Sequence, residues 1–262
     1  MSSLVARFQM LSRTIGALNT GATKKFGRVS KSEFPMAMSR QGKVRNAPTD
    51  ARRTVLIPPL MLEGNLDLPG DATGVVLFAH GSGSSRFSPR NRYVAAALCR
   101  AGFGTLLFDL LTEDEATDRA RVFDIPLLAE RLGTAVEWLA TQPDTCRLPL
   151  GLFGASTGAA AALVMAAESP RQVGAVVSRG GRPDLAGAAL RKVRAPTLLI
   201  VGGDDPEVLE LNRTARAELH CISELRIVLG ATHLFEEAGK LDIVIDLAQA
   251  WFGAHLSAGR KG

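Results

Sequence analysis

The sequence predicts a doubly wound α/β fold, in which a mostly parallel sheet of eight strands carries helices on both faces. Three observations lead to this prediction. Short apolar runs alternate with longer amphipathic stretches, as expected for repeated strand–helix–strand crossovers. Several of these runs are apolar throughout, which is typical of strands buried on both faces. The residues Gly154-Ala155-Ser156-Thr157-Gly158 stand between an apolar run and an Ala-rich stretch, where a strand can turn sharply into a helix.

The charge divides the chain into a leader and a body. Residues 1–53 hold eleven basic and two acidic residues, a net charge of +9. Because the whole chain carries +5, a net charge of −4 is left for residues 54–262. We therefore treat 1–53 as a basic leader and linker, and 54–262 as a single domain. The basic character belongs to the leader, so the charge of the body does not favour a nucleic-acid partner.

The leader is amphipathic at its start. Leu4, Phe8, Leu11, Ile15 and Leu18 are spaced to share one face of a helix, and residues 1–29 contain no acid. Such a pattern is typical of an organelle transit peptide or a membrane-surface helix. The interpretation we favour is an unstructured, basic tail.

The composition also indicates in which cellular compartment the protein acts and which kinds of partner to expect. No apolar run approaches the ~20 residues that a bilayer crossing requires, so we expect no stable membrane insertion. Three widely spaced cysteines fit neither a disulfide framework nor a metal site. We expect a cytoplasmic protein without a metal, and organelle targeting by residues 1–29 is the alternative for a eukaryotic source.

The body begins with two runs joined through Pro58-Pro59, which predict an antiparallel hairpin at one edge of the sheet. The predicted strands are 54–57, 60–68, 74–79, 104–108, 148–153, 173–177, 197–201 and 224–229. The predicted helices are 91–100, 124–140, 157–167, 184–190, 207–219 and 241–252. Only nineteen, mostly polar residues separate strands 173–177 and 197–201. We therefore expect a minimal lid, an open pocket and a small, soluble substrate.

Ser156 is the candidate nucleophile. In a G-x-S-x-G turn the strained backbone lifts the serine hydroxyl clear of the sheet, and the small flanking residues let neighbouring backbone pass close by. The helix that follows begins beside the developing oxyanion, so the Thr157 N–H can donate a hydrogen bond to it.

A serine hydroxyl attacks efficiently only when a base takes its proton. His233 follows the last predicted strand, at the sheet edge where catalytic loops collect, and is the predicted base. Asp204 and Asp205 follow the penultimate strand, and either carboxylate could orient the imidazole. We favour Asp205, which stands just before the proline that opens the next helix. Asp204 is the reserve, and one of the two could instead cap that helix.

The segment HGSGSSR follows strand 74–79 and has two functional interpretations. It could be an oxyanion loop, in which the Ser82 N–H faces the Ser156 hydroxyl. It also nearly fits a dinucleotide fingerprint, with Asp109 as the ribose-binding acid. Arg86 in the third glycine position and the delay of the helix by Pro89 argue against the second interpretation. We therefore expect an oxyanion loop and no cofactor.

The further candidates for substrate binding are Gly83, Arg86, Asp109 and Arg179. They follow strand ends and should surround the nucleophile. The arginines would suit a carboxylate or phosphate on the substrate. The alternative is that they pair with nearby acids, among them Asp109 and Asp184.

The motifs LFAHGSGSSR, LFDLLT, GLFGASTGAA, SRGGRPDL, LLIVGGDD and GATHLFEE, in this order, resemble the α/β-hydrolase superfamily and within it the dienelactone hydrolase-like family. The resemblance covers residues 54–257 and implies an eight-stranded sheet whose second strand is antiparallel. It also implies a triad of Ser156, Asp205 and His233, with the N–H groups of Ser82 and Thr157 as the oxyanion hole. Similar domains also occur fused to phosphoribosyltransferase modules.

One departure bears on the substrate. Dienelactone hydrolases proper carry cysteine at the position of Ser156, so the resemblance implies a more general ester or thioester hydrolase. The sequence thus predicts a cofactor-independent serine hydrolase that acts on a small-molecule ester through an acyl-enzyme on Ser156. The alternatives are a catalytically silent binding module of the same fold and, less favoured, a dinucleotide-binding enzyme. The oligomeric state and the acyl and leaving groups stay open.

Overall fold

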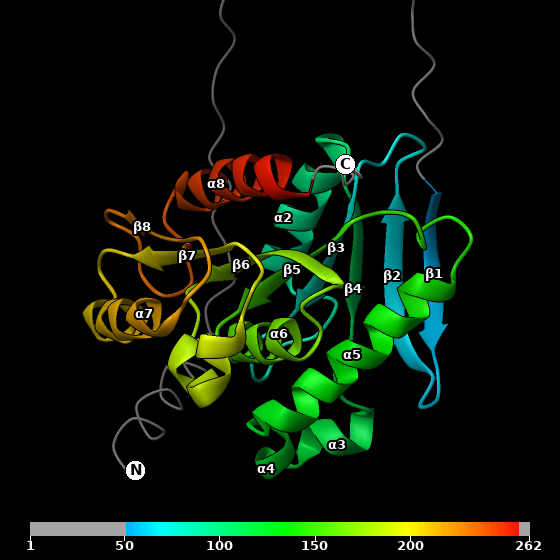
Figure 1. Ribbon diagram of the computed structural model, residues 1–262, viewed down its shortest axis with the longest axis horizontal. Helices are drawn as coiled ribbons and strands as arrows, with labels where there is room; N and C mark the ends of the chain where they lie inside the picture. Colours follow the sequence, from blue (N-terminus) through cyan, green and yellow to red (C-terminus); the bar gives the residue numbers. More distant parts are fainter. Residues whose placement is uncertain (1–50, 257–262) are drawn as a thin grey trace, which may run out of the picture. The chain divides into compact units, whose positions relative to one another are not determined.

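A computed structural model describes residues 51–256, and the amphipathic stretch of the leader lies outside this range. Its centre is one eight-stranded sheet in the order β1-β2-β4-β3-β5-β6-β7-β8 (Figure 1). The strands are β1 (Ala51–Ile57), β2 (Leu62–Leu68), β3 (Val75–Ala79), β4 (Gly104–Phe108), β5 (Leu150–Ala155), β6 (Val173–Arg179), β7 (Thr197–Gly202) and β8 (Ser223–Val228). β2 pairs antiparallel with both of its neighbours, and all other neighbouring pairs are parallel. The structure is the α/β-hydrolase fold that the sequence predicts.

Helices cover both faces of the sheet. They are α2 (Pro89–Arg100), α3 (Glu113–Thr117), α4 (Arg119–Val122), α5 (Ile125–Thr141), α6 (Thr157–Glu168), the 3₁₀ segment η2 (Pro183–Lys192), α7 (Pro206–Glu218) and α8 (Lys240–His255). In Figure 1, α2 and α8 lie above the sheet, whereas α5, α6 and α7 lie below it. This is the doubly wound arrangement that parallel strands with right-handed crossovers produce.

The central strands are predominantly apolar because both of their faces are buried. Along β3, Leu77 and Ala79 pack into one hydrophobic cluster, whereas Val76 and Phe78 pack into the other. Successive side chains of a strand point to opposite faces, so one strand supplies both clusters. Phe78 on β3 stacks against Phe153 on the neighbouring β5, with 4.9 Å between ring centroids. The two strands that lead to the site are therefore fixed in the middle of the core.

Each predicted segment overlaps an observed strand or helix, with ends that differ by up to three residues, and three differences have a clear physical reason. β1 begins at Ala51, three residues before the predicted start at 54. Its first residues are polar, but Arg52 pairs with Asp67 on β2 at 2.8 Å, and this cross-strand ion pair extends the hairpin. The segment predicted as helix 184–190 is a 3₁₀ segment interrupted at Gly187. Helices α3 and α4 were not predicted, because they are short and bury no side chain.

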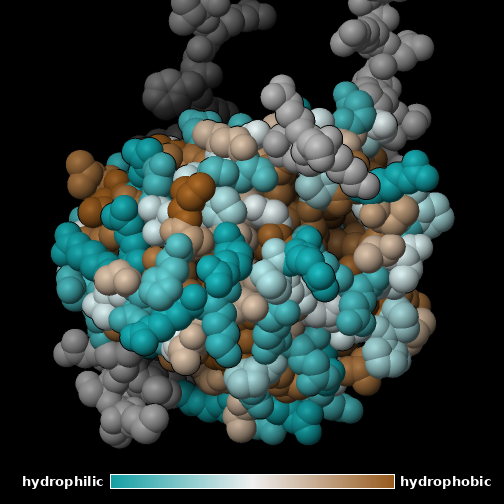
Figure 2. Space-filling view, in the orientation of Figure 1, coloured by the Kyte–Doolittle hydropathy of each residue, from teal (hydrophilic) through white to brown (hydrophobic). Residues whose placement is uncertain are grey.

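The surface has no broad apolar face in the view of Figure 2, where hydrophilic side chains dominate and hydrophobic ones form separate patches. None of the helices within residues 51–256 combines the length and the apolarity that a bilayer crossing requires.

Candidate functional site

Ser156 lies on the turn between β5 and α6, at the C-terminal edge of the sheet. Its φ of +51° is unusual for a residue with a side chain, so the turn is strained. The turn tolerates no bulk on either side. A Cβ at Gly158 would lie 2.3 Å from the Ala79 carbonyl oxygen, and a Cβ at Gly154 would lie 2.4 Å from the Ala159 Cα. Both glycines are therefore required by close backbone approach.

His233 and Asp205 come from two other loops at the same edge. His233 follows β8, and Asp205 stands directly before α7. The His233 Nε2 lies 3.4 Å from the Ser156 Oγ, and the His233 Nδ1 lies 2.7 Å from the Asp205 Oδ2. Because a carboxylate only accepts, the short contact assigns the Nδ1 proton to His233 and leaves Nε2 free to face the serine. The structure brings together the three residues that the sequence singled out.

The same geometry separates Asp205 from Asp204. Asp204 is exposed, whereas Asp205 is partly buried beneath the imidazole. Asp205 occupies the N-cap position of α7, but its side chain makes no capping hydrogen bond. An aspartate in this position usually accepts from the first helical N–H groups. Here the carboxylate is directed to His233 instead, which favours Asp205 over the reserve candidate.

The loop after β3 lies against the nucleophile. A Cβ on Gly81 would be 3.0 Å from the Ser156 Cβ, which is tighter than an ordinary contact, so the loop packs closely against the nucleophile. The Ser82 N–H donates to the Thr157 Oγ1 at 2.9 Å, and this bond ties the loop to the first residue of α6. The Thr157 N–H has no acceptor within its own helix, because it begins the first turn. Both backbone donors that the sequence proposed thus lie beside Ser156, one of them held by the Thr157 hydroxyl.

His80 holds this loop from the other side. The Leu110 N–H donates to its Nε2 at 3.2 Å, which leaves Nδ1 to donate to the Gly81 carbonyl oxygen at 3.0 Å. Burial lowers the pKa of His80 below its ordinary value, opposed by the bond to Gly81 and the charge of Asp109. A neutral imidazole with this tautomer satisfies both bonds. His80 therefore links the loop to the segment after β4.

The candidate arginines are engaged by the protein itself. Arg86 contacts Asp109 and Glu63, and its backbone N–H donates to the Asp109 Oδ1 at 2.7 Å. Arg182 pairs with Asp184 at 2.7 Å. These are the pairings that the alternative interpretation of the arginines predicts.

Arg179 does not reach the rim where we expected it. Its side chain is buried, with 6% exposure, and contacts the Leu234 carbonyl oxygen and the Asn91 Oδ1, both at 3.4 Å. Burial, with a contribution from Arg90, lowers the pKa of Arg179 to about 10, so the guanidinium stays charged at neutral pH. The buried Arg179 side chain supports the loop that carries His233. This position does not match the role in substrate binding that the sequence predicts for Arg179.

A hollow of about 500 Å³ lies against the loop after β3. Gly81, Ser82 and Gly83 form one wall, and the residues after β4 form another. The start of β2 contributes Glu63, a residue that the sequence analysis missed. Because β2 runs antiparallel, its N-terminal end lies at the sheet edge where the parallel strands end, and the Asp109 N–H donates to the Glu63 carbonyl oxygen at 3.0 Å. The predicted antiparallel second strand was the signal that could have placed Glu63 here.

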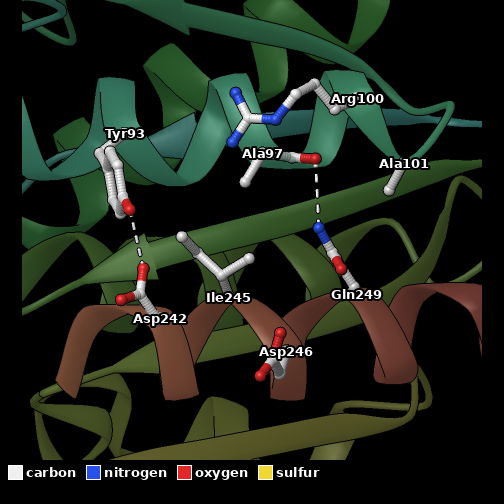
Figure 3. A pocket seen from close by; sticks show the side chains of 8 residues that line it. All are labelled: Tyr93, Ala97, Arg100, Ala101, Asp242, Ile245, Asp246 and Gln249. Atoms are coloured by element: carbon white, nitrogen blue, oxygen red, sulfur yellow. Dashed lines mark hydrogen bonds between the residues drawn. The ribbon is translucent and has the colours of Figure 1, made fainter. Parts of the chain in front are cut away.

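A second hollow, of about 320 Å³, lies between α2 and α8 and is lined by none of the residues discussed above (Figure 3). Figure 3 shows Tyr93 pointing toward Asp242, to which its hydroxyl donates at 2.8 Å. Gln249 donates to the Ala97 carbonyl oxygen at 3.1 Å. These bonds join the two helices, and we interpret this hollow as a gap in the packing between them.

Comparison with known sequences places the chain among hydrolases. The dienelactone hydrolase family profile matches residues 62–242. Two Mycobacterium tuberculosis proteins, from strains CDC 1551 and H37Rv, are each 60% identical over 207 residues. Their names assign them provisionally as phosphoribosyl transferases. The match covers 79% of this chain but 47% of each relative, so the chain spans about half the length of these relatives.

Solved structures give the same result at the level of the fold. A dienelactone hydrolase from Anabaena variabilis is 55% identical, with a TM-score of 0.76, over 80% of this chain and all of that one. The protein Est1E from Butyrivibrio proteoclasticus, at 14% identity and a TM-score of 0.65 over 78% of this chain and 98% of its own, shares the fold. The family profile and the 55% identical structure together show that this chain belongs to the dienelactone hydrolase family.

Proposed function

We propose that this hydrolase cleaves a small carboxylic ester or thioester through an acyl-enzyme on Ser156. The observation that carries the proposal is the continuous chain from the Ser156 Oγ through His233 to Asp205, with contacts of 3.4 Å and 2.7 Å. The first contact is longer than an ideal hydrogen bond, as is common before substrate binds. The three residues come from loops that follow three separate strands. Packing of the hydrophobic core does not require their side chains to meet.

In the acylation half-reaction, the Ser156 Oγ attacks the carbonyl carbon while His233 Nε2 takes the hydroxyl proton. The resulting imidazolium is stabilised by the Asp205 carboxylate, which keeps its charge throughout. When the tetrahedral intermediate collapses, the imidazolium returns the proton to the leaving alcohol or thiol. A water molecule then repeats the sequence, with His233 as its base, and releases the acid and free Ser156.

The developing oxyanion is stabilised by the N–H groups of Thr157 and Ser82. The Thr157 donor lies at the start of α6, where the helix dipole also favours negative charge. The Ser82 donor is held at rest by the Thr157 hydroxyl at 2.9 Å. We propose that the oxyanion replaces this hydroxyl as the acceptor, so the donor needs little movement.

Two other functions are weaker. A silent binding module would not need a strained serine whose hydroxyl faces an imidazole oriented by a carboxylate. The names of the M. tuberculosis relatives mention a phosphoribosyl transferase, and these proteins are about twice as long as the segment that matches this chain. We propose that any transferase activity resides outside the half that this chain matches, because the matched half contains the candidate hydrolase site.

Labelling with a fluorophosphonate probe tests the proposal. We expect the parent protein to be labelled and to hydrolyse p-nitrophenyl acetate, and Ser156→Ala to do neither. A folded parent that is not labelled contradicts the serine mechanism. Labelling that survives in Ser156→Ala places the nucleophile elsewhere. Ser169→Ala, at the far end of α6, is the matched control and should retain full labelling.

A further inference from the structure

The 500 Å³ hollow adjoins the loop that packs against Ser156. Gly81 lines the hollow, and a hypothetical Cβ on Gly81 would be 3.0 Å from the Ser156 Cβ, so this loop is in close contact with the candidate nucleophile. Ser82, whose N–H we propose as an oxyanion donor, lines the same wall. The hollow and the candidate nucleophile therefore share the segment Gly81-Ser82 as a common wall.

The charged side chains of this hollow are predominantly acidic. Three carboxylates line it, from Glu63, Asp109 and Glu113, against one guanidinium, from Arg86. Both terminal nitrogens of Arg86 are taken, one by Asp109 and the other by Glu63. The remaining Nε is buried and has no partner among the described residues, so it is not presented to solvent. Glu113 is exposed on the first turn of α3 and is not paired with Arg86.

His80, also in the lining, does not offset this charge. Both of its ring nitrogens are engaged by backbone groups, at 3.0 Å and 3.2 Å. A second proton would turn the Nε2 acceptor into a donor facing the Leu110 N–H. The imidazole is therefore neutral, and the lining has a formal charge of −2.

Three other arginines near the site are held by the protein, and none of them lines the hollow. Arg90 pairs with Glu236 at 2.6 Å, and Arg182 pairs with Asp184 at 2.7 Å. Arg179 is buried beneath the His233 loop. The rim of the hollow is apolar, with exposed side chains from Leu60, Met61 and Phe87.

We propose that one substituent of the reacting ester enters this hollow, and that the hollow selects substituents that are neutral or positively charged and disfavours those bearing a second carboxylate or a phosphate. Apolar rim residues take the aliphatic part of the substituent, and Glu63, Asp109 and Glu113 set the preferred charge. This inference rests on the proposed serine esterase function and specifies its substrate class. It differs from the anionic substrate group that was one of the two interpretations of the arginines in the sequence.

Two matched series of esters test the inference. The first places the charge on the acyl side, with p-nitrophenyl hexanoate, the 6-aminohexanoate and the adipate half-ester. The second places it on the alcohol side, with acetates of 3,3-dimethylbutanol, choline and 4-hydroxybutanoate. In the series whose variable group enters the hollow, we expect kcat/KM for the anionic ester to be about tenfold or more below that of its neutral counterpart, because the added negative charge is repelled by the acidic lining. The cationic ester should equal or exceed the neutral one.

Variants then connect the discrimination to the hollow. Glu113→Gln and Glu63→Gln should each reduce the ratio of neutral to anionic kcat/KM by about threefold or more. Glu168→Gln removes an exposed carboxylate at the end of α6 opposite to Ser156 and should leave the ratio unchanged. If the anionic ester equals the neutral one in both series, or if the ratio is unaffected in both glutamate variants, the inference is wrong. If neutral esters show no turnover that depends on Ser156, the proposed function itself fails, which is a separate outcome.

Discussion

Asp205→Asn gives the sharpest test of the proposed machinery. The substitution keeps the shape of the side chain and removes its charge. In the folded protein, the Asp205 Oδ2 accepts from His233 Nδ1 at 2.7 Å. An asparagine amide can donate to Nδ1 instead, which moves the imidazole proton to Nε2. That nitrogen faces the Ser156 Oγ at 3.4 Å and could no longer take the hydroxyl proton.

The expected loss follows from these two effects. The charged hydrogen bond at 2.7 Å that stabilises the imidazolium is worth roughly 1.5–3 kcal/mol. Reversal of the tautomer adds the cost of returning the imidazole to its active form. Together they lower kcat by roughly 10³–10⁴-fold, or about 4–5.5 kcal/mol in the activation free energy. KM should change little, because Asp205 contacts His233 and not the substrate.

The assay is p-nitrophenyl acetate hydrolysis, with circular dichroism to confirm the fold of each variant. Asp204→Asn is the matched control, since Asp204 is adjacent and exposed. We expect its kcat to stay within about threefold of the parent, as for most surface changes. The reasoning is refuted if Asp205→Asn loses less than tenfold, or if Asp204→Asn proves the more damaging change.

Three further predictions concern the scaffold of the site. Gly158→Ala should abolish activity and lower the free energy of unfolding by ~3 kcal/mol in urea titrations, because its Cβ would meet the Ala79 carbonyl oxygen at 2.3 Å; near-parent stability would show that the turn can relax. Ser156→Gly should be more stable than Ser156→Ala by about 1 kcal/mol in the same assay, since glycine relieves the positive φ of +51°; an equal or lower stability would show that the turn is not strained. Burial lowers the folded-state pKa of His80, so its contribution to stability is complete above the unfolded pKa of about 6.5 and declines as the pH falls below it. His80→Gln should therefore lose less stability than the parent between pH 7.5 and 5.5, whereas the exposed control His220→Gln should follow the parent; a His80→Gln variant with the parent's pH profile would contradict the buried neutral imidazole.

The fold was readable from the sequence because its strands carry one-dimensional signals. β3, β4 and β5 are buried at every position, and all of their residues except Thr105 are apolar, as expected for strands covered on both faces. The helices α3 and α4 lack such a signal, since no apolar periodicity marks a short exposed helix. A capping box at Thr112 and Glu115, which the structure forms, was the local pattern that could have revealed α3.

Some features of the candidate site could likewise be predicted from the sequence, whereas others became visible only in the structure. Ser156 was identifiable because its glycines are required by the local turn, and His233 because it follows the last strand. The sequence already favoured Asp205 over Asp204, but the contact of the Asp205 carboxylate with His233 became visible only in the structure, since it depends on the direction of the side chain. The positions of Ser82 and Thr157 beside the nucleophile could be expected, but the hydrogen bond between them could not.

The sequence by itself determined the eight-stranded α/β-hydrolase architecture and the loops that carry the candidate nucleophile, base and acid. Both follow from periodicity and from steric demands within a few residues of the chain. Only the tertiary structure decided what the arginines do. Arg86 meets Glu63 from an antiparallel strand and Asp109 from a parallel one, and Arg179 turns into the core. Charge pairing depends on distances between segments far apart in the chain, so the sign of the charge beside Ser156 becomes visible only after folding.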